Sequence, residues 1–279
     1  MDSLLANEPL IRLAVFVGVL TLMAGLEALF PRRPRAAGRW LRWPNNFGVV
    51  VVDSLIVRIL FPTAAVGIAL AMEGRGVGLL PWLGIPQPLA ILFAIVVLDF
   101  AIYLQHVMFH AVPLLWRLHR MHHADLDFDV TTGLRFHPVE IVLSMVIKLM
   151  VVVALGAPAV AVLIFEVLLN ATAMFNHANL RLPGWVDRAL RLVLVTPDMH
   201  RVHHSVVPRE TNSNFGFNLA VWDRIFGTYR AQPAAGHDAM TIGIQQFRDP
   251  RELRLDRMLT QPLRDEDRAY ALGRREGAS

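Results

Sequence analysis

The sequence predicts an all-α polytopic membrane protein: a helical bundle with four to five membrane segments and a histidine-rich helical cap on the cytoplasmic side. Three observations support this fold class. The chain is 54% hydrophobic with a mean hydropathy of +0.44, which is too apolar for an ordinary soluble enzyme. Several apolar runs are long enough to cross a bilayer. Ten of the 11 histidines lie between positions 106 and 204, so they are concentrated in one part of the chain.

The apolar runs give the order of the membrane segments. Residues 9–30, 46–72 and 87–110 are each predicted to form one span. A longer run, residues 139–175, is interrupted by Gly156-Ala157-Pro158, which predicts a hairpin of two helices. The first nine residues carry Asp2 and Glu8 but no basic residue, so the first run is expected to be a retained helix and not a cleaved signal.

The arginines predict the orientation of the bundle. Five arginines and no acidic residue lie between positions 32 and 42, and such a loop is expected on the cytoplasmic side. The N-terminus is then outside, and the later spans return every histidine-rich segment to the cytoplasm. The absence of cysteine excludes disulfides, thiolate zinc sites, iron–sulfur clusters and cysteine nucleophiles.

The histidines occur at helical spacing. The pair at 106 and 110 is four residues apart, and the pattern H-x-x-H-H occurs twice, beginning at 119 and at 200. Residues three and four apart lie on one face of a helix, and neutral imidazole is the commonest metal ligand in proteins. The hairpin adds one histidine at each of its ends. We therefore predict two metal ions, with no catalytic side chain beyond the ten ligands: His106, His110, His119, His122, His123, His137, His177, His200, His203 and His204.

Polar residues on the spans share faces with these histidines. Asp99 and Tyr103 lie on the face of the third span that also carries the histidines at 106 and 110. Glu166 and Asn170 precede the histidine at 177 on the last span in the same way. Polar groups within a membrane usually face the bundle interior. These four are therefore candidate channel or metal-supporting residues, with a structural polar seam as the alternative.

Two further predictions concern charged residues. Lys148 and Glu166 each lie nine residues from Ala157 at the hairpin turn, which places them at similar depth and predicts an ion pair between the two helices. Outside the spans, four acids are candidates to offset the charge of the metals, although each also suits a helix cap or a surface position: Asp125, Asp198, Glu210 and Asp223.

The three histidine motifs resemble those of the fatty acid hydroxylase and sterol desaturase superfamily of membrane di-iron enzymes. Supporting stretches are RFHPVE (135–140), NHANLRLP (176–183), TPDMHRVHHS (196–205) and NFGFNLAVWDRIFGTY (214–229). The last of these is similar to the closing signature of the bacterial sterol desaturase-like branch. The resemblance implies residues 45–230 as the di-iron domain, after an N-terminal helix and basic loop (1–44) and before a charged tail (231–279). The tail contains His237, which is expected to be a surface residue.

The resemblance also implies an activity. Two irons held by histidine nitrogens would use O2 and external electrons to hydroxylate or desaturate an unactivated C–H bond of a lipid. Electrons would come from a separate ferredoxin- or cytochrome-type donor, because no haem domain is evident in the chain. The lipid, a fatty acyl chain, sterol, ether lipid or carotenoid, would enter from the bilayer. The expected location is the bacterial inner membrane, with the site on the cytoplasmic side and with no nucleic-acid partner.

Other readings account for fewer of the histidines. A membrane zinc hydrolase needs a glutamate base beside its ligands, and the sequence has no H-E-x-x-H motif. A bis-histidine haem protein needs only one facing pair. A metal-binding protein or transporter without redox chemistry is the main alternative, but transporters place their sites near the bilayer midplane, and these histidines lie at predicted helix ends.

Overall fold

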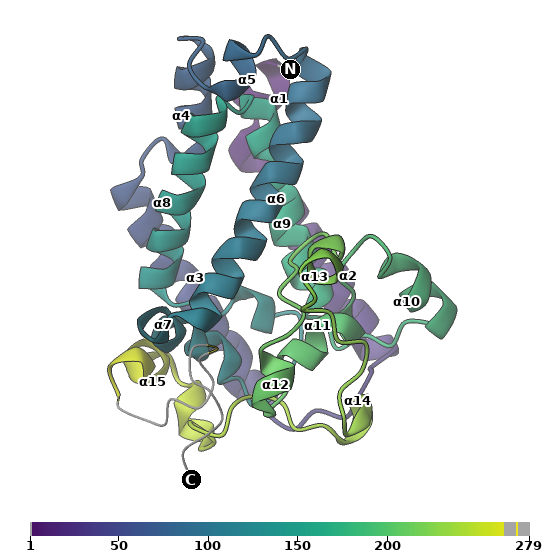
Figure 1. Ribbon diagram of the computed structural model, residues 1–279. Helices are drawn as coiled ribbons and strands as arrows, with labels where there is room; N and C mark the ends of the chain where they lie inside the picture. Colours follow the sequence, from purple (N-terminus) through teal and green to yellow (C-terminus); the bar gives the residue numbers. More distant parts are fainter. Residues whose placement is uncertain (1, 265–271, 273–279) are drawn as a thin grey trace.

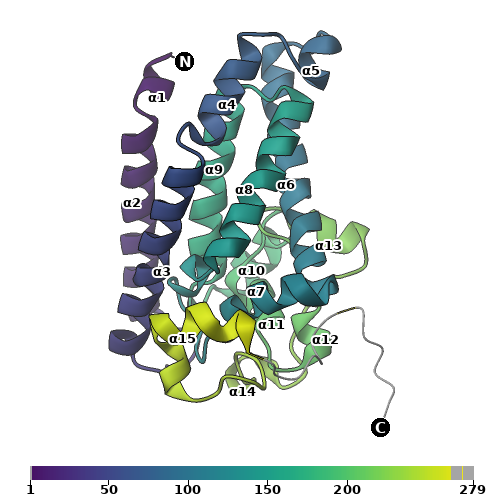
Figure 2. The same ribbon diagram turned by 90° about the vertical axis from the view of Figure 1, so that its left-hand side faces the viewer.

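The computed structural model describes residues 2–264 and Leu272. Its main feature is a bundle of long apolar helices that run roughly parallel (Figures 1 and 2). Five candidate membrane spans occur among the described residues. They are α2 (Glu8–Leu29), α3 (Arg39–Leu60) continued by α4 (Ala64–Glu73), α6 (Gln87–Ala111), α8 (Pro138–Leu155) and α9 (Ala159–Asn176). The described residues form no strand, so the all-α prediction is confirmed.

Short helices cover the two ends of this bundle. At the end near the N-terminus lie α1 (Asp2–Ala6) and α5 (Leu79–Trp82) (Figure 2). The opposite end carries a thick cap of short helices joined by loops (Figure 1). The cap comprises α7 (Pro113–His123), η1 (Thr132–Leu134), α10 (Gly184–Leu190), α11 (Pro197–His203), α12 (Pro208–Thr211), α13 (Val221–Ile225), α14 (Gly236–Ala239), η2 (Pro250–Leu253), α15 (Leu255–Thr260) and η3 (Gln261–Leu263).

The second span differs from its prediction at its start and in its interior. It begins at Arg39, seven residues before the apolar run, so two of the arginines assigned to a loop lie on α3. Arg42 is fully buried, because Asp125 and Asp129 in the cap bind its guanidinium group. The helix then breaks before α4 at Pro62, which cannot continue the hydrogen-bond ladder. Sequence polarity alone therefore misplaced the start of this helix.

The hairpin between α8 and α9 forms where it was predicted. Gly156 ends α8 in the left-handed conformation, with φ of 62°, which glycine adopts without steric cost. Pro158 then precedes the first residue of α9. The loop before α5 packs tightly against this turn, since a Cβ atom built on Gly78 would lie 2.1 Å from the Gly156 nitrogen. Gly156 is thus needed for the left-handed conformation of the turn, and Gly78 for the close approach of the neighbouring loop.

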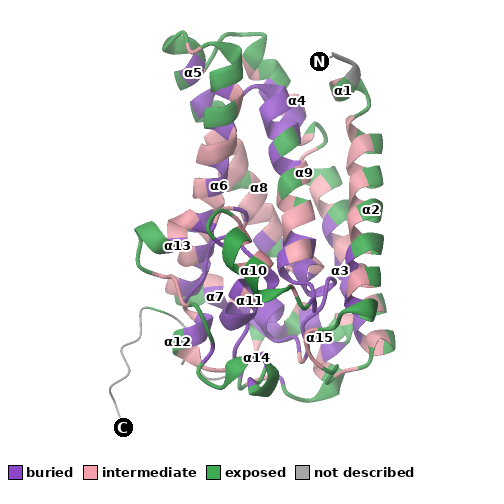
Figure 3. Ribbon diagram, turned by 90° about the vertical axis from the view of Figure 1, so that its right-hand side faces the viewer, coloured by how far each residue is buried: buried purple, intermediate pink, exposed green. Residues whose placement is uncertain are grey.

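Burial separates the bundle from its cap. Buried residues gather in the cap and on the inner faces of the long helices, while the outer faces are exposed (Figure 3). On α2 the exposed side chains are apolar, with Leu10 65% and Leu13 60% exposed. Apolar side chains on an outer surface suit lipid and not water. The described part of the chain is therefore an integral membrane bundle with a compact polar end.

The predicted ion pair lies inside the bundle and has a further partner. Lys148 of α8 and Glu166 of α9 are in contact, as expected. Arg12 of α2 also binds Glu166, which the sequence did not indicate. The guanidinium of Arg12 additionally lies 2.6 Å from Glu8 one turn away. These four side chains, whose charges sum to zero, thus connect the spans α2, α8 and α9.

Candidate metal centre

Nine of the histidines in the described chain form two buried groups. In each group every residue offers one ring nitrogen, and these nitrogens lie within 4.8 Å of one another. The five-histidine group is His106, His110, His119, His123 and His203, and the four-histidine group is His122, His177, His200 and His204. Nine of the ten predicted ligands are therefore brought together, and the spacing of nitrogens within each group matches one metal ion.

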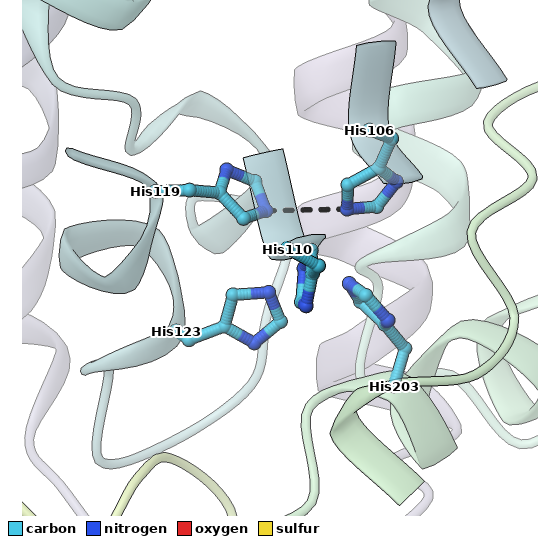
Figure 4. A group of neighbouring side chains, drawn as sticks. All are labelled: His106, His110, His119, His123 and His203. Carbon is cyan, nitrogen blue, oxygen red and sulfur yellow. Dashed lines mark hydrogen bonds between the residues drawn. The ribbon is translucent and has the colours of Figure 1, made fainter. Parts of the chain in front are cut away.

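Helix geometry explains how the motifs divide between the groups. Consecutive residues of a helix point about 100° apart. In α7 the histidines at 119 and 123 therefore face one group, and the histidine at 122 faces the other. In α11 the histidine at 203 belongs to the first group, while the histidine at 200 and the one at 204, directly after the helix, belong to the second. Helix α6 contributes only to the five-histidine group (Figure 4), and the end of α9 contributes His177 to the other.

Hydrogen bonds fix which ring nitrogen faces inward. His106 donates from Nδ1 to the Phe215 carbonyl oxygen at 2.8 Å, and His203 donates from Nδ1 to the Ser213 carbonyl oxygen at 2.7 Å. The remaining Nδ1 donors are His110 to Asn212 Oδ1, His119 to Glu140, His122 to the Arg135 carbonyl and His177 to the Ala173 carbonyl. Carbonyl and carboxylate oxygens accept only, so in each ring the hydrogen is on Nδ1 and Nε2 keeps its lone pair.

These lone pairs face each other at short range. The Nε2 atoms of His106 and His119 are 3.2 Å apart (Figure 4, dashed line). In the other group, Nε2 of His177 lies 3.2 Å from that of His122. Neither nitrogen of these pairs has a hydrogen to donate, so the contacts are repulsive unless a cation lies between them. The arrangement therefore fits metal ions, with each outer hydrogen bond orienting a ligand.

Burial keeps these rings neutral. Desolvation lowers the pKa of five cap histidines well below the usual value, and neighbouring imidazoles lower it further: His122, His123, His200, His203 and His204. Burial likewise lowers the pKa of His177 to about 3. A metal ligand must be deprotonated, so at neutral pH no proton competes for these sites.

One loop orients most of the five-histidine group. Asn212, Ser213 and Phe215 provide the acceptors for three of its rings. Asp223 holds this loop by accepting from the backbone N–H groups of Phe215 at 2.7 Å and Gly216 at 2.8 Å. Side chains are excluded at Gly216, where a Cβ atom would lie 2.7 Å from Asp223 Oδ2. Asp223 thus positions ligands through the backbone and touches no metal site itself.

Glu140 is an acid that the sequence analysis missed. Its Oε1 accepts from Nδ1 of His119 at 2.7 Å, and the residue is 4% exposed. The predicted Asp125 instead binds Arg42 in a two-point contact at 2.8 Å for each bond. Burial alone would raise the pKa of Asp125, but the charge and hydrogen bonds of Arg42 outweigh it and lower the pKa to about 2. The role of Glu140 could have been predicted from its position. It lies in the first turn of α8, the helix that begins at the cap.

The other candidate residues lie around the site. Asp99 accepts from Trp222 Nε1 at 2.7 Å, and the Tyr103 hydroxyl pairs with Thr228 at 3.0 Å. Both residues fasten the segment after the Phe215 loop to α6. Asp198 binds Arg201 and Arg32; Glu210 accepts from the Ala234 N–H at 2.6 Å; and Asn170 donates to the Glu166 carbonyl and lines a cavity.

Two histidines differ from expectation. His137 lies outside both groups and caps the start of α8, where Nδ1 accepts from the Val139 N–H and Nε2 donates to the Leu259 carbonyl, each at 3.2 Å. A histidine directly before the proline that begins a helix is placed for this role, so the sequence held the signal. His237 was expected at the surface, but it is only 4% exposed and lies 3.7 Å from Asp198.

A cavity of about 270 Å³ leads from the bundle to the five-histidine group. Its walls come from α2, α3, α6, α8 and α9, and His106 and His119 form its inner end. Phe109, Phe136 and Phe217 make the walls next to these histidines largely apolar. None of the four-histidine group lines the cavity. A long apolar molecule held here would therefore meet the five-histidine site.

A bundle of apolar helices capped by two buried imidazole groups defines a class of integral membrane proteins whose histidine clusters can hold metal ions. Residues 91–228 match the family described as fatty acid hydroxylase. The chain is a member of this superfamily, as its histidine motifs predicted.

Three relatives are informative. The chain is 30% identical over 149 residues to ornithine lipid hydroxylase OlsE of Rhizobium tropici, covering 53% of this chain and 44% of the relative. It is 31% identical over 160 residues to alkylglycerol monooxygenase of Homo sapiens, covering 55% and 33%. It is 29% identical over 146 residues to fatty acid hydroxylase vlmA of Lecanicillium sp, covering 48% and 40%. Each match therefore spans less than half of the relative. No solved structure matches the chain.

Proposed function

We propose that this chain is a membrane-bound oxygenase that binds two irons and uses O2 and external electrons to hydroxylate an unactivated C–H bond of a lipid. The observation that carries the proposal is the pair of buried groups formed by nine imidazoles, of which His106 and His119 form the inner end of a largely apolar cavity. A histidine-only set suits iron among other metals, and the names of the relatives favour hydroxylation over desaturation. Fatty acyl, sterol and related lipids remain the substrate classes.

The residues of the chain have distinct roles in this activity. Bound iron would supply the activation of O2 and the oxidation of the C–H bond. Glu140 holds the proton on Nδ1 of His119, so that Nε2 stays free for the metal. The loop around Phe215 does the same for His106. The aromatic walls exclude water and align the lipid chain, so that one carbon lies next to the site.

A small pocket between α2 and α9 supports access from the bilayer. It is lined by Arg12 and Met174 among others, and it shares Phe16 and Asn170 with the main cavity. Helix α2 is the most weakly buried of the spans, with 6% of its apolar window buried. We infer that a lipid enters sideways between α2 and α9, past Phe16. A separate ferredoxin- or cytochrome-type protein would supply electrons at the cap, which we expect on the cytoplasmic side of a bacterial inner membrane.

Metal analysis and oxygen uptake test this function together. Protein expressed with iron and purified in detergent is expected to hold two irons per chain and to consume O2 with a reductant and a lipid extract. His203→Ala and His200→Ala should each lower the metal content by one ion and activity by more than about 10-fold. His137→Ser removes an imidazole but keeps a helix cap, and it should retain both metals.

Two outcomes would contradict the proposal. A folded parent protein that holds at most one metal ion excludes a two-metal centre. A protein that holds two irons but consumes no O2 with any lipid fraction is a metal-binding protein without redox catalysis. Treatment of the parent with a chelator should also lower its melting temperature, because the facing lone pairs then repel each other.

A further inference from the structure

The main cavity contains polar atoms that nothing in the described chain satisfies. Oδ1 of Asp53, Oε1 of Gln105 and Oε2 of Glu140 are buried without a hydrogen-bond partner among the described residues. These residues come from α3, α6 and α8, and all three line the cavity. Buried acceptors without a donor are costly and rare in proteins. Their convergence on one cavity therefore points to a ligand that brings the donor.

Every unsatisfied group here is an acceptor. The Nε2–H₂ group of Gln105 is used on Ser144 at 2.7 Å, and the amide of Asn170 donates to the Glu166 carbonyl at 3.0 Å. None of the described residues that line the cavity is Lys or Arg. Asp53 and Glu140 place two carboxyl groups on the wall of the same cavity. Apart from the hydroxyl groups of Ser54 and Ser144, the polar atoms that line the cavity are thus mainly acceptors.

We propose that the cavity selects lipids whose head carries a hydrogen-bond donor, an alcohol or an ammonium group, held by Asp53 with Gln105 and Glu140. A bare hydrocarbon chain would leave the three acceptors unsatisfied. A free carboxylate head would bring two more acceptor oxygens and no donor. The inference rests on the proposed oxygenase function for its meaning, but the binding preference exists whether or not the bound lipid is oxidised.

The donor group would lie close to the oxidised carbon. Gln105 is the residue before His106 on α6, and Glu140 is bound to His119. These two histidines form the metal-facing end of the cavity. The head of the lipid is therefore held at that end, and oxidation is expected near the polar head and not at the far methyl end. Pocket shape alone would not give this preference.

Binding of four single-chain lipids tests the selection without any oxygen chemistry. Hexadecanol and hexadecylamine offer donors, hexadecyl methyl ether offers only an acceptor, and palmitate offers a carboxylate. Each lipid competes against radiolabelled hexadecanol for the iron-loaded protein in detergent, without O2 or reductant. The alcohol, the amine or both should bind at least about 10-fold more tightly than the ether and palmitate.

Three variants assign the preference to this site. Asp53→Leu should reduce it by about 10-fold, while Asp53→Asn should weaken the amine more than the alcohol, because it removes the carboxyl group that can pair with an ammonium but keeps an acceptor oxygen. Asp99→Asn alters a buried acid that lies outside the cavity, and it should leave the preference unchanged. Metal content and melting temperature confirm that each variant is folded, and Asp53→Asn alone decides the case if the leucine variant is not.

The proposal is overturned if palmitate or the ether competes as well as the alcohol and amine. It is equally overturned if folded Asp53→Leu keeps the parent's preference, or if Asp53→Asn weakens the amine and the alcohol equally. A parent that shows the predicted order but consumes no O2 leaves the donor site standing and refutes the oxygenase instead. The two failures are therefore distinguishable.

Discussion

The charge network inside the bundle makes a quantitative prediction about stability. Glu166 is its centre, because it binds both Lys148 and Arg12, and its side chain is 4% exposed. Glu166→Leu leaves Lys148 without its partner in an apolar environment and removes one of the two partners of Arg12. Breaking a buried ion pair from one side costs about 3–5 kcal/mol. At about 2–4 °C per kcal/mol, the melting temperature in detergent should fall by roughly 6–20 °C.

Replacing either of the two cations, Lys148 or Arg12, should lower the stability less than Glu166→Leu does, and by different amounts. Lys148→Met leaves Glu166 with Arg12 as a partner, so the loss is that of one charged hydrogen bond, about 1.5–3 kcal/mol. The side chain of Arg12 is 29% exposed against 12% for Lys148, and Arg12 keeps Glu8 as a second partner. Arg12→Met should therefore be the mildest single change.

The combination decides between a coupled network and independent residues. If the charges stabilise each other, the triple change to apolar residues at 12, 148 and 166 should be milder than Glu166→Leu alone. Thermal unfolding of the parent, the three single variants and the triple variant measures this. Arg58→Met, which removes an exposed charge from α3, is the control and should shift the melting temperature little. Losses that simply add across the triple variant would refute the network.

Two further predictions concern the cap. Asp223→Ala should release the Phe215 loop and lower metal affinity by about 10–100-fold, with metal titration as the measurement and unchanged affinity as the contradicting result. The pKa of Asp125 is lowered from 3.8 to about 2, so its pairing stabilises the fold above about pH 4 and is lost as the pH falls toward 2. This contribution is about 2 kcal/mol. In a metal-free protein Asp125→Asn should therefore flatten the decline in stability between pH 4 and 2, and an equal slope in parent and variant would exclude this role.

The sequence was sufficient where the signal was local. Long apolar runs predicted the spans, and Gly156 with Pro158 predicted the hairpin, because helix breaking depends on the residues at the break. Helical spacing predicted that the histidines would cluster, because neighbours three and four apart share a face. His137 is the exception. Its place directly before Pro138 also suits the N-cap of a helix, and in the structure it forms the N-cap of α8.

Contacts between distant segments could not be predicted in this way. Arg42 is buried because acids 83 and 87 residues away surround it, whereas a local pattern presents only an arginine-rich loop. His237 is buried because Asp198, far from it in the chain, lies against it. Arg12 joins the predicted ion pair across 154 residues. In each case the partner is polar and remote, so neither hydropathy nor periodicity carries the information.

The structure also makes the two histidine groups inequivalent. The five-histidine group borders the cavity through His106 and His119, and Glu140 places a carboxylate beside it. The four-histidine group lines no part of the cavity, and two of its rings donate to backbone carbonyls and not to acids. Neutral ligands leave the charge of a bound cation uncompensated, so Glu140 lowers the net charge at one site only. We therefore expect the lipid to react at the five-histidine site. A metal in the four-histidine group would affect the lipid only through its neighbouring metal and not by direct contact.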